Sequence, residues 1–130
     1  MEARSQPHIM ATVNTILIVD DNAGFRLFAR AILEAEGFVV VGEADDGSSG
    51  IRDALRLDPD LVLLDIGLPD IEGFEVARQL ADADPAPLVV LTSSREASEF
   101  GPRLASSAAL GFIAKDELSG AAIRDLAEAV

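Results

Sequence analysis

The stretch Leu61-Val62-Leu63-Leu64-Asp65, four apolar residues followed by a carboxylate, decides the fold. Turn residues bound it on both sides, with Asp58-Pro59-Asp60 before it and Gly67-Leu68-Pro69 after it. A continuous apolar run bounded by turns predicts a strand buried on both faces, as in a parallel sheet. Asp65 then stands at the carboxyl end of that strand, where open α/β sheets bind their ligands.

Three further apolar runs lead directly into polar residues. Residues 16–19 precede Asp20 and Asp21, residues 88–91 precede Thr92, and residues 112–114 precede Lys115. A β-branched run at 38–41 supplies the fifth expected strand. Because a helical pattern follows each strand, the chain alternates strand and helix five times. This alternation predicts an α/β fold, a (βα)5 doubly wound parallel sheet of five strands with helices on both faces.

The expected helices carry more detailed predictions. Asn22 and Ser119 are expected to cap the first and last helices. Ser93 and Glu96 have the spacing of a capping box, which predicts a fourth helix that continues to about Ala108 and is the least firmly anchored. The first helix is expected to bury an apolar stripe formed by Phe25, Phe28, Ile32 and Ala35.

Length and composition narrow the class of protein. The 130 residues are 49% hydrophobic, which predicts one domain over residues 15–130 after a flexible leader at 1–14. The absence of cysteine excludes disulfides, and no apolar run approaches the ~20 residues of a membrane span, so we expect a cytoplasmic protein. The net charge of −13 disfavours direct binding of nucleic acid and suits Mg²⁺.

The polar residues at the strand ends suggest a shared chemistry. The carboxyl ends of parallel strands meet at one edge, so Asp20, Asp21 and Asp65 should crowd there. Two charges ~4 Å apart repel by about 4 kcal/mol at an effective dielectric near 20, so the three carboxylates need a cation or a raised pKa. Oxygen ligands with open positions favour Mg²⁺. A carboxylate beside Mg²⁺ can attack a phosphoryl group, whose charge Lys115 and the Thr92 hydroxyl would stabilise.

Taken singly, each of these residues is also compatible with an ordinary role in a turn, a cap or the surface. Their combination resembles the response-regulator receiver domains of two-component signalling. The resemblance covers residue 15 to the C-terminus. The form of the motif in this sequence is similar to that of receivers attached to helix-turn-helix output domains. The matching segments are residues 16–22 (ILIVDDN), 61–73 (LVLLDIGLPDIEG), 89–93 (VVLTS) and 111–116 (GFIAKD).

The resemblance implies a flavodoxin-like sheet with strand order 2-1-3-4-5. It also implies that Asp65 accepts a phosphoryl group, which a sensor histidine kinase or a histidine phosphotransfer protein supplies and which the domain slowly hydrolyses. Asp21, Asp65 and the Gly67 carbonyl would bind Mg²⁺, with Asp20 acting largely through water. Homodimers through the fourth and fifth helices are a further expectation from the family.

The family also assigns the switch residues. Thr92 would turn toward the phosphoryl group, Lys115 would pair with it, and Phe112 occupies the aromatic switch position. Three residues depart from the common pattern. Phe112 lacks the hydroxyl of the more usual tyrosine, Asp116 stands where many members have proline, and Gly67 has no side chain to tune the phosphoryl lifetime.

Two other functions remain open from the sequence. The chain could be an interaction module of the same fold that its partners regulate without phosphorylation. It could also be a small phosphohydrolase similar to the haloacid dehalogenases, with Asp20 as nucleophile. That family places an acid two residues after its nucleophile, whereas this chain has Asn22 there.

Overall fold

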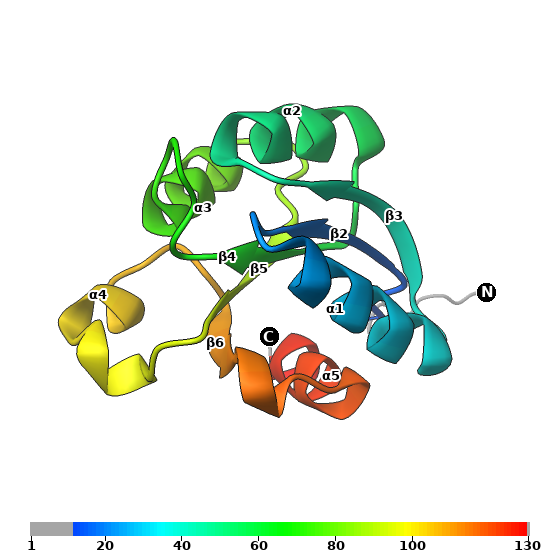
Figure 1. Cartoon of the computed structure of the whole chain (residues 1–130). Coiled ribbons are helices and arrows are strands. Elements are labelled where there is room, and N and C mark those ends of the chain that lie inside the picture. The colour runs from blue at the N-terminus through cyan, green and yellow to red at the C-terminus, as the bar shows by residue number, and fades with distance from the viewer. Residues whose placement is uncertain (1–11, 130) are drawn as a thin grey trace.

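The computed structural model describes residues 12–129, which form a central sheet flanked by helices (Figure 1). All five strands run parallel, in the order β3-β2-β4-β5-β6. Counted along the chain this is the order 2-1-3-4-5, so the predicted doubly wound fold is confirmed. The strands are β2 (Thr15–Val19), β3 (Val39–Ala44), β4 (Leu61–Asp65), β5 (Leu88–Ser93) and β6 (Gly111–Ala114).

Helices cover both faces of the sheet (Figure 1). One face packs against α1 (Ala23–Ala35) and α5 (Gly120–Glu128), and the other against α2 (Gly47–Leu57) and α3 (Gly73–Ala81). The remaining helix, α4 (Pro102–Ala105), is a single turn in the connection between β5 and β6. Within residues 12–129, none of the helices has the length and apolarity that a membrane crossing requires.

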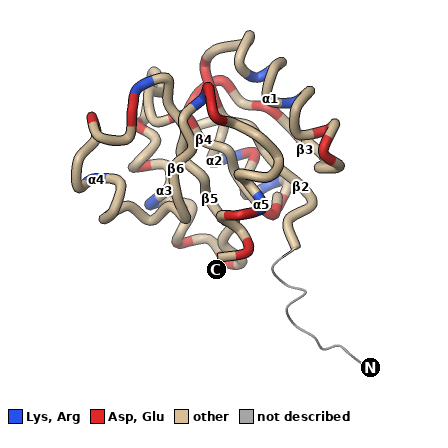
Figure 2. Tube along the Cα trace, turned by 90° about the horizontal axis from the view of Figure 1, so that it is seen from below, with Lys and Arg blue, Asp and Glu red and all other residues tan. Residues whose placement is uncertain are grey.

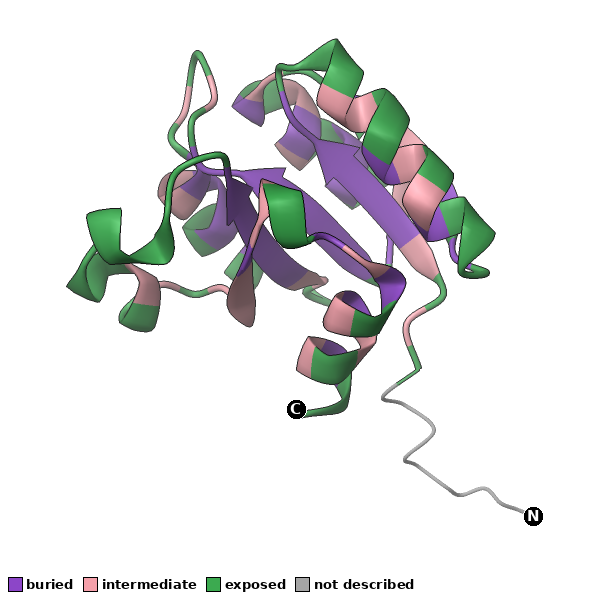
Figure 3. Cartoon of the chain, turned by 60° about the horizontal axis from the view of Figure 1, so that its bottom comes forward, coloured by how far each residue is buried: buried purple, intermediate pink, exposed green. Residues whose placement is uncertain are grey.

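The central strands are buried on both faces, as their apolar runs predict. Along β4, Leu61 and Leu63 pack on the side of α1 and α5, while Val62 and Leu64 pack on the side of α2 and α3. Successive strand side chains point to opposite faces, so one strand contributes to both halves of the core. Figure 3 shows these strands in purple, enclosed by helices that are buried along one side only.

Shortening a core side chain should cost much of the stability. Leu63 has no exposed surface, so Leu63→Ala is expected to lower the free energy of unfolding by roughly 2–5 kcal/mol, because it removes buried methylenes and leaves a cavity. Urea denaturation measures this loss. Leu55→Ala is the control, since Leu55 is 63% exposed and its replacement should stay within about 0.5 kcal/mol. Equal losses for the two variants would contradict this view of the core.

The chain reaches the sheet just before β2. Most of the predicted leader, residues 1–11 of 1–14, lies outside the described residues. At its end, the Asn14 carbonyl accepts a hydrogen bond from the Val39 N–H (2.8 Å), and the Asn14 N–H donates to Asp60 Oδ2 (2.9 Å). These contacts tie the entry of β2 to the two strands beside it.

The predicted caps of the first and last helices are confirmed. Asn22 Oδ1 accepts a hydrogen bond from the Phe25 N–H (2.9 Å), and Ser119 Oγ accepts one from the Ala122 N–H (3.0 Å). Each cap satisfies a backbone donor that the first turn of a helix leaves free. The Asn22 cap starts α1 directly after the acidic pair at the end of β2, and this fixes the direction in which the chain leaves the sheet.

The buried face of α1 differs from the predicted stripe. Ala29 and Leu33 are its fully buried residues, whereas Phe28 is 50% exposed and Ala35 is exposed. The prediction was therefore wrong for Phe28 and Ala35. Small Ala29 and the larger Leu33, four residues apart, lie on one side of the helix and face the sheet. Phe28 is left outside, where its ring lies 6.2 Å from that of Phe25.

The predicted fourth helix, from Ser93 to Ala108, is wrong. Ser93 is the last residue of β5, and its hydroxyl accepts a hydrogen bond from the Arg95 N–H (3.0 Å) instead of capping a helix. The connection contains a 3₁₀ turn, η2 (Ala97–Glu99), and then the short α4. This segment therefore has little regular structure to hold it in place.

Local chemistry explains why no long helix forms there. The capping box joins Glu96 and Glu99 around the 3₁₀ turn, three residues later than predicted. Gly101 then adopts a φ of 59°, which ends the turn, and Pro102 opens α4. Glycine tolerates this left-handed backbone and proline suits a first helical position, so the two residues divide the segment.

The second strand also differs from the predicted 38–41, because it runs from Val39 to Ala44. Gly42 does not end it but pairs with Leu17 of β2. A Cβ atom on Gly42 would lie 2.9 Å from Leu57 Cδ1, so this position lets α2 pack closely on the strand. The extension carries Glu43 and Ala44 to the edge where β2 ends.

Candidate functional site

Four strand ends bring the predicted polar residues to one edge of the sheet. Asp20 and Asp21 follow β2, Asp65 ends β4, Thr92 lies near the end of β5, and Lys115 follows β6. Asp65 and Thr92 are direct partners across β4 and β5. The parallel register thus gathers residues that are far apart in the sequence.

Three carboxylates form the centre of this site. One oxygen each from Asp20, Asp21 and Asp65 lies within 4.8 Å of the others. Asp20 is fully buried and Asp65 is 6% exposed, whereas Asp21 is exposed. A cation held by these oxygens would therefore face protein on one side and water on the side of Asp21, an arrangement typical of Mg²⁺.

The Lys115 ammonium partly balances this negative charge. Its Nζ atom lies 2.8 Å from Asp20 Oδ2 and 3.8 Å from Asp65 Oδ2, and its side chain is 17% exposed. Nζ also lies 4.6 Å from the centroid of the Phe25 ring, which keeps water from one side of it. One ammonium against three carboxylates leaves an excess of negative charge, which would attract a cation.

The carboxyl group of Asp65 reflects this excess of negative charge. Burial raises its pKa above the ordinary value of 3.8, and the charge of Asp20 raises it further. The Lys115 ammonium and the Gly67 N–H lower the pKa, while the charge of Asp21 adds a smaller upward shift. The net direction is upward, so without a cation the folded chain carries a disfavoured charge at this position.

Removing that charge should stabilise the protein when no divalent cation is present. Because the pKa of Asp65 is raised by folding, its negative charge destabilises the folded state. This destabilisation is absent below pH 3.8, the unfolded-state value, and fully present above the folded-state pKa. Asp65→Asn is therefore expected to raise the melting temperature by a few degrees at pH 7 in a chelator. The difference should shrink as the pH is lowered toward 3.8. Thermal unfolding followed by circular dichroism measures both, and a lower melting temperature for the variant at pH 7 would contradict the assignment.

Thr92 places a hydroxyl without a partner next to the cluster. The residue has no exposed surface, and its Oγ1 atom makes no hydrogen bond to the described residues. A buried hydroxyl left unpaired costs about 1–3 kcal/mol. Thr92 is the direct partner of Asp65 across β4 and β5, so the two side chains lie on the same face of the sheet.

The loop after β4 holds Gly67 beside the site. Gly67 is exposed, and its N–H lies 3.4 Å from Asp65 Oδ1. Farther along the loop, Asp70 accepts hydrogen bonds from the N–H groups of Gly47 (2.7 Å) and Ser48 (2.9 Å) at the start of α2. These bonds hold the pKa of Asp70 well below its usual range. Asp70 therefore anchors the loop, a role that sequence reasoning missed because its partners lie on another helix.

Gly73 is a second residue that the sequence did not single out for the site. A Cβ atom there would lie 2.5 Å from the Asp65 carbonyl oxygen and 2.7 Å from Ile66 Cα. The Gly73 N–H also donates to the Ile66 carbonyl (2.8 Å). Glycine is thus required where α3 begins, because its backbone touches the strand end that carries Asp65.

An aromatic cluster joins β6 and α3 to the connection between β5 and β6. Phe112 of β6 is half-buried, and its ring centroid is 6.1 Å from that of Phe100, which in turn lies 5.9 Å from that of Phe74 of α3. Arginine side chains stack on two of the rings, Arg95 on Phe100 and Arg103 on Phe74. The cluster links the sheet edge to the irregular connection before β6.

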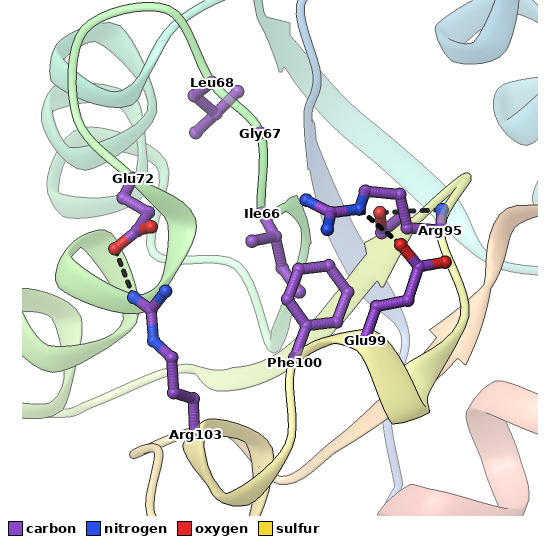
Figure 4. Close-up of a pocket in the computed structure, with 9 residues that line it drawn as sticks. Ile66, Gly67, Leu68, Glu72, Arg95, Glu99, Phe100 and Arg103 are labelled. Carbon is purple, nitrogen blue, oxygen red and sulfur yellow. Dashed lines mark hydrogen bonds and ion pairs between the residues drawn. The ribbon is translucent and has the colours of Figure 1, made fainter.

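Phe100 also borders a cavity of about 440 Å³ (Figure 4). The cavity opens between the loop after β4, where Ile66 and Gly67 lie, and the connection that carries Glu99 and Arg103. Arg95 pairs with Glu99, and Arg103 pairs with Glu72 across it. The two ion pairs therefore lie at the border of the cavity.

The basic residues of the described chain are dispersed rather than gathered on one segment. In Figure 2 the basic residues (blue) lie on several separate segments, among more numerous acidic ones (red). Many of the arginines of the described chain are neutralised locally, as Arg78 is by Glu75 (2.7 Å).

Comparisons with known proteins agree with this geometry. The family model for the response regulator receiver domain matches residues 16–127. The response regulator GacA of Pseudomonas viridiflava is 34% identical over 116 residues, which are 88% of this chain and 52% of that protein. A Bordetella pertussis protein that carries the name of the virulence-factor transcription regulator BvgA is 38% identical over 104 residues, 80% of this chain and 50% of its own.

Among solved structures, a LuxR-family two-component response regulator from Aurantimonas sp. SI85-9A1 superposes with a TM-score of 0.78 at 28% identity. The match covers 89% of this chain and 86% of that one. The chain spans about half the length of the two curated relatives.

Proposed function

The chain belongs to the family of response regulator receiver domains, and on that premise we propose that Asp65 accepts a phosphoryl group and that partner binding changes as a result. The expected donor is a phosphohistidine on a sensor histidine kinase or a histidine phosphotransfer protein. An Asp65 oxygen forms the new bond to phosphorus, the phosphorus–nitrogen bond breaks, and its electron pair returns to the imidazole. The product is an aspartyl phosphate, which water slowly hydrolyses.

One observation carries this proposal. The Asp65 carboxylate stands at a buried strand end, within 4.8 Å of two other carboxylates and 3.8 Å from the Lys115 ammonium. Oxygen ligands in negative excess suit Mg²⁺, which would neutralise charge on the transferring phosphoryl group. Asp21, Asp65 and the Gly67 carbonyl would hold this ion, with Asp20 acting through water.

Lys115 and Thr92 have separate tasks in this mechanism. The Lys115 ammonium contacts Asp20 in the free state and lies within reach of Asp65. It would pair with a phosphoryl oxygen once the acceptor carries one. The unpaired Thr92 hydroxyl would donate to another oxygen of the group, and this would satisfy its buried polar atom.

The geometry favours Asp65 over Asp20 as the acceptor. Asp20 is fully buried, its Oδ1 accepts a hydrogen bond from the Asn22 N–H (2.9 Å), and its Oδ2 contacts Lys115 (2.8 Å). One oxygen is thus hydrogen-bonded, and the other forms an ion pair with Lys115 but no hydrogen bond among the described residues. Asp65 Oδ2, at 3.8 Å from Lys115, is less tightly held. This contrast supports a receiver rather than a phosphohydrolase that uses Asp20.

The aromatic cluster is the proposed route from the site to a partner. Movement of Thr92 toward a phosphoryl group would disturb β6, where Ile113 is its direct partner and the neighbouring Phe112 packs its ring on Phe100. Phe112 has no hydroxyl, so its packing and not a hydrogen bond must carry the change. The weakly structured connection around Phe100 and α4 would then shift and alter the surface that a partner meets.

Chemical phosphorylation tests the proposal. The purified chain is incubated with acetyl phosphate and Mg²⁺ and its intact mass is measured. A gain of about 80 Da that disappears slowly after the donor is removed is the expected result. If the wild-type chain gains no mass from acetyl phosphate or from a phosphorylated kinase, the interaction module without phosphorylation becomes the better description.

A further inference from the structure

An arginine on α1 reaches back to the end of β2. Arg26 Nη1 donates a hydrogen bond to the Asp20 carbonyl oxygen (2.6 Å), and Nε of the same guanidinium donates to Glu43 Oε1 (3.0 Å). The Arg26 side chain is 19% exposed. One rigid group therefore joins the peptide between Asp20 and Asp21 to the end of β3.

Every other polar group of Asp20 is held by a different part of the fold. Its N–H donates to the Ala44 carbonyl of β3 (3.0 Å), and its carboxylate contacts Asn22 and Lys115. Its carbonyl lies just past β2, and among residues 12–129 it is Arg26 that supplies its hydrogen bond. Without that bond, the carbonyl would lose the partner it has among the described residues, and the peptide that leads into Asp21 would be held less firmly.

Glu43 keeps the guanidinium in place. Its second oxygen accepts a hydrogen bond from Arg30 Nε (2.7 Å), so two arginines of α1 share one carboxylate. The hydrogen bond from Arg30 holds the pKa of Glu43 below its ordinary value despite partial burial, and Arg26 adds to this. Glu43 therefore stays ionised as the anchor of Arg26.

We propose that Arg26 is a positioning residue for the Mg²⁺ site, because its paired hydrogen bonds fix the peptide that joins Asp20 to Asp21. The inference rests on the proposed function. Arg26 does not touch the ion but orients the two carboxylates that present oxygens to it. Groups that orient metal ligands in this way typically change metal affinity 10- to 100-fold when they are removed.

The direction in which Mg²⁺ affinity changes distinguishes a positioning role of Arg26 from the effect of its positive charge alone. Removing a positive charge near a cation site should tighten Mg²⁺ binding. If Arg26 positions the carboxylates, its removal should instead weaken binding. Arg26→Met, which keeps the apolar stem but has no donors, is expected to raise the Mg²⁺ dissociation constant by about 10-fold. Magnesium titrations followed by ¹⁵N–¹H NMR spectra measure this dissociation constant. NMR is the suitable method because the chain has no Trp or Tyr to report binding by fluorescence.

Arg30→Met is the matched control. It removes one positive charge from the same helix and one partner of the same Glu43 carboxylate. Arg30, however, contacts Glu34 and Glu43 rather than Asp20. We expect its Mg²⁺ affinity to be unchanged or slightly tighter. Arg26→Lys keeps the charge, but its donors all sit on one nitrogen and lack the planar fork that reaches Asp20 and Glu43 from two nitrogens, so it should lose most of the affinity that Arg26→Met loses.

A second readout does not depend on the metal. The amide of Asp21 belongs to the peptide whose carbonyl Arg26 holds, so its resonance should move in Arg26→Met before Mg²⁺ is added and stay in place in Arg30→Met. Wild-type affinity in Arg26→Met or in Arg26→Lys would overturn the inference. If the wild-type chain itself shows no Mg²⁺-dependent shifts, the proposed function fails instead.

Discussion

Asp65→Asn is expected to abolish phosphorylation of the chain by acetyl phosphate. Asparagine keeps the shape of the side chain but has no anionic oxygen to attack phosphorus, so the rate of adduct formation should fall by about 100-fold or more. The variant should still fold, because replacing a buried, repelled carboxylate relieves strain among the charges of the cluster. Intact-mass measurements over time, on wild type and variant side by side, provide the comparison.

Asp45→Asn is the matched control for this experiment. Asp45 is exposed and follows β3 at the same edge of the sheet, as Asp20 follows β2, but it is not part of the carboxylate cluster. Its replacement removes one negative charge without touching the proposed acceptor. We expect wild-type rates for Asp45→Asn. An undiminished adduct on Asp65→Asn would place the chemistry on another residue.

Removal of Mg²⁺ is expected to have the second largest effect. Without a divalent cation, three carboxylates and one ammonium meet an incoming phosphoryl group, and the net charge repels it. Excess chelator should therefore slow phosphorylation by about 10²- to 10³-fold, and restoring Mg²⁺ should recover the rate. The measurement is the initial rate of adduct formation against free Mg²⁺ concentration.

Asp21→Asn refines this test. Asp21 is the exposed member of the cluster, so its replacement should leave the core intact and raise the Mg²⁺ concentration needed for half-maximal rate. Asp45→Asn again supplies the comparison for loss of charge alone. A rate that does not depend on Mg²⁺ in the wild-type chain would mean that the carboxylates serve another purpose.

Much of the fold and the membership of the site could be predicted from the sequence. Apolar runs such as 61–64 can only be buried on both faces, and a parallel sheet then brings all their carboxyl ends to one edge. That argument places Asp20, Asp65 and Thr92 at one edge, and the strand order implied by the resemblance makes Asp65 and Thr92 neighbours, as they are in the structure.

What the sequence could not supply depends on tertiary contacts. The face of α1 that meets the sheet differs from the predicted stripe, because Ala29 and Leu33 fit there while Phe28 turns outward. The long helix predicted after Ser93 gives way to η2 and α4, since Gly101 and Pro102 override the apparent capping box. The spacing of residues within one segment does not determine which face of a helix packs on the sheet, or whether the rest of the fold allows a helix there.

Supporting residues were hidden for the same reason. Arg26 has the appearance of an ordinary surface arginine on an amphipathic helix, and only the close approach of α1 to the ends of β2 and β3 gives it two partners. Asp70 likewise gains its role by reaching the first turn of α2. Such contacts join segments that no short motif connects.

Locating the phosphoryl group on the chain tests the central claim most directly. Wild-type protein is phosphorylated with acetyl phosphate and Mg²⁺, the acyl phosphate is reduced with borohydride, and the peptides are sequenced by mass spectrometry. We expect homoserine at position 65 and unmodified aspartate at positions 20 and 21. Homoserine at position 20, with position 65 unchanged, would contradict the account and identify the chain's chemistry as that of a phosphohydrolase.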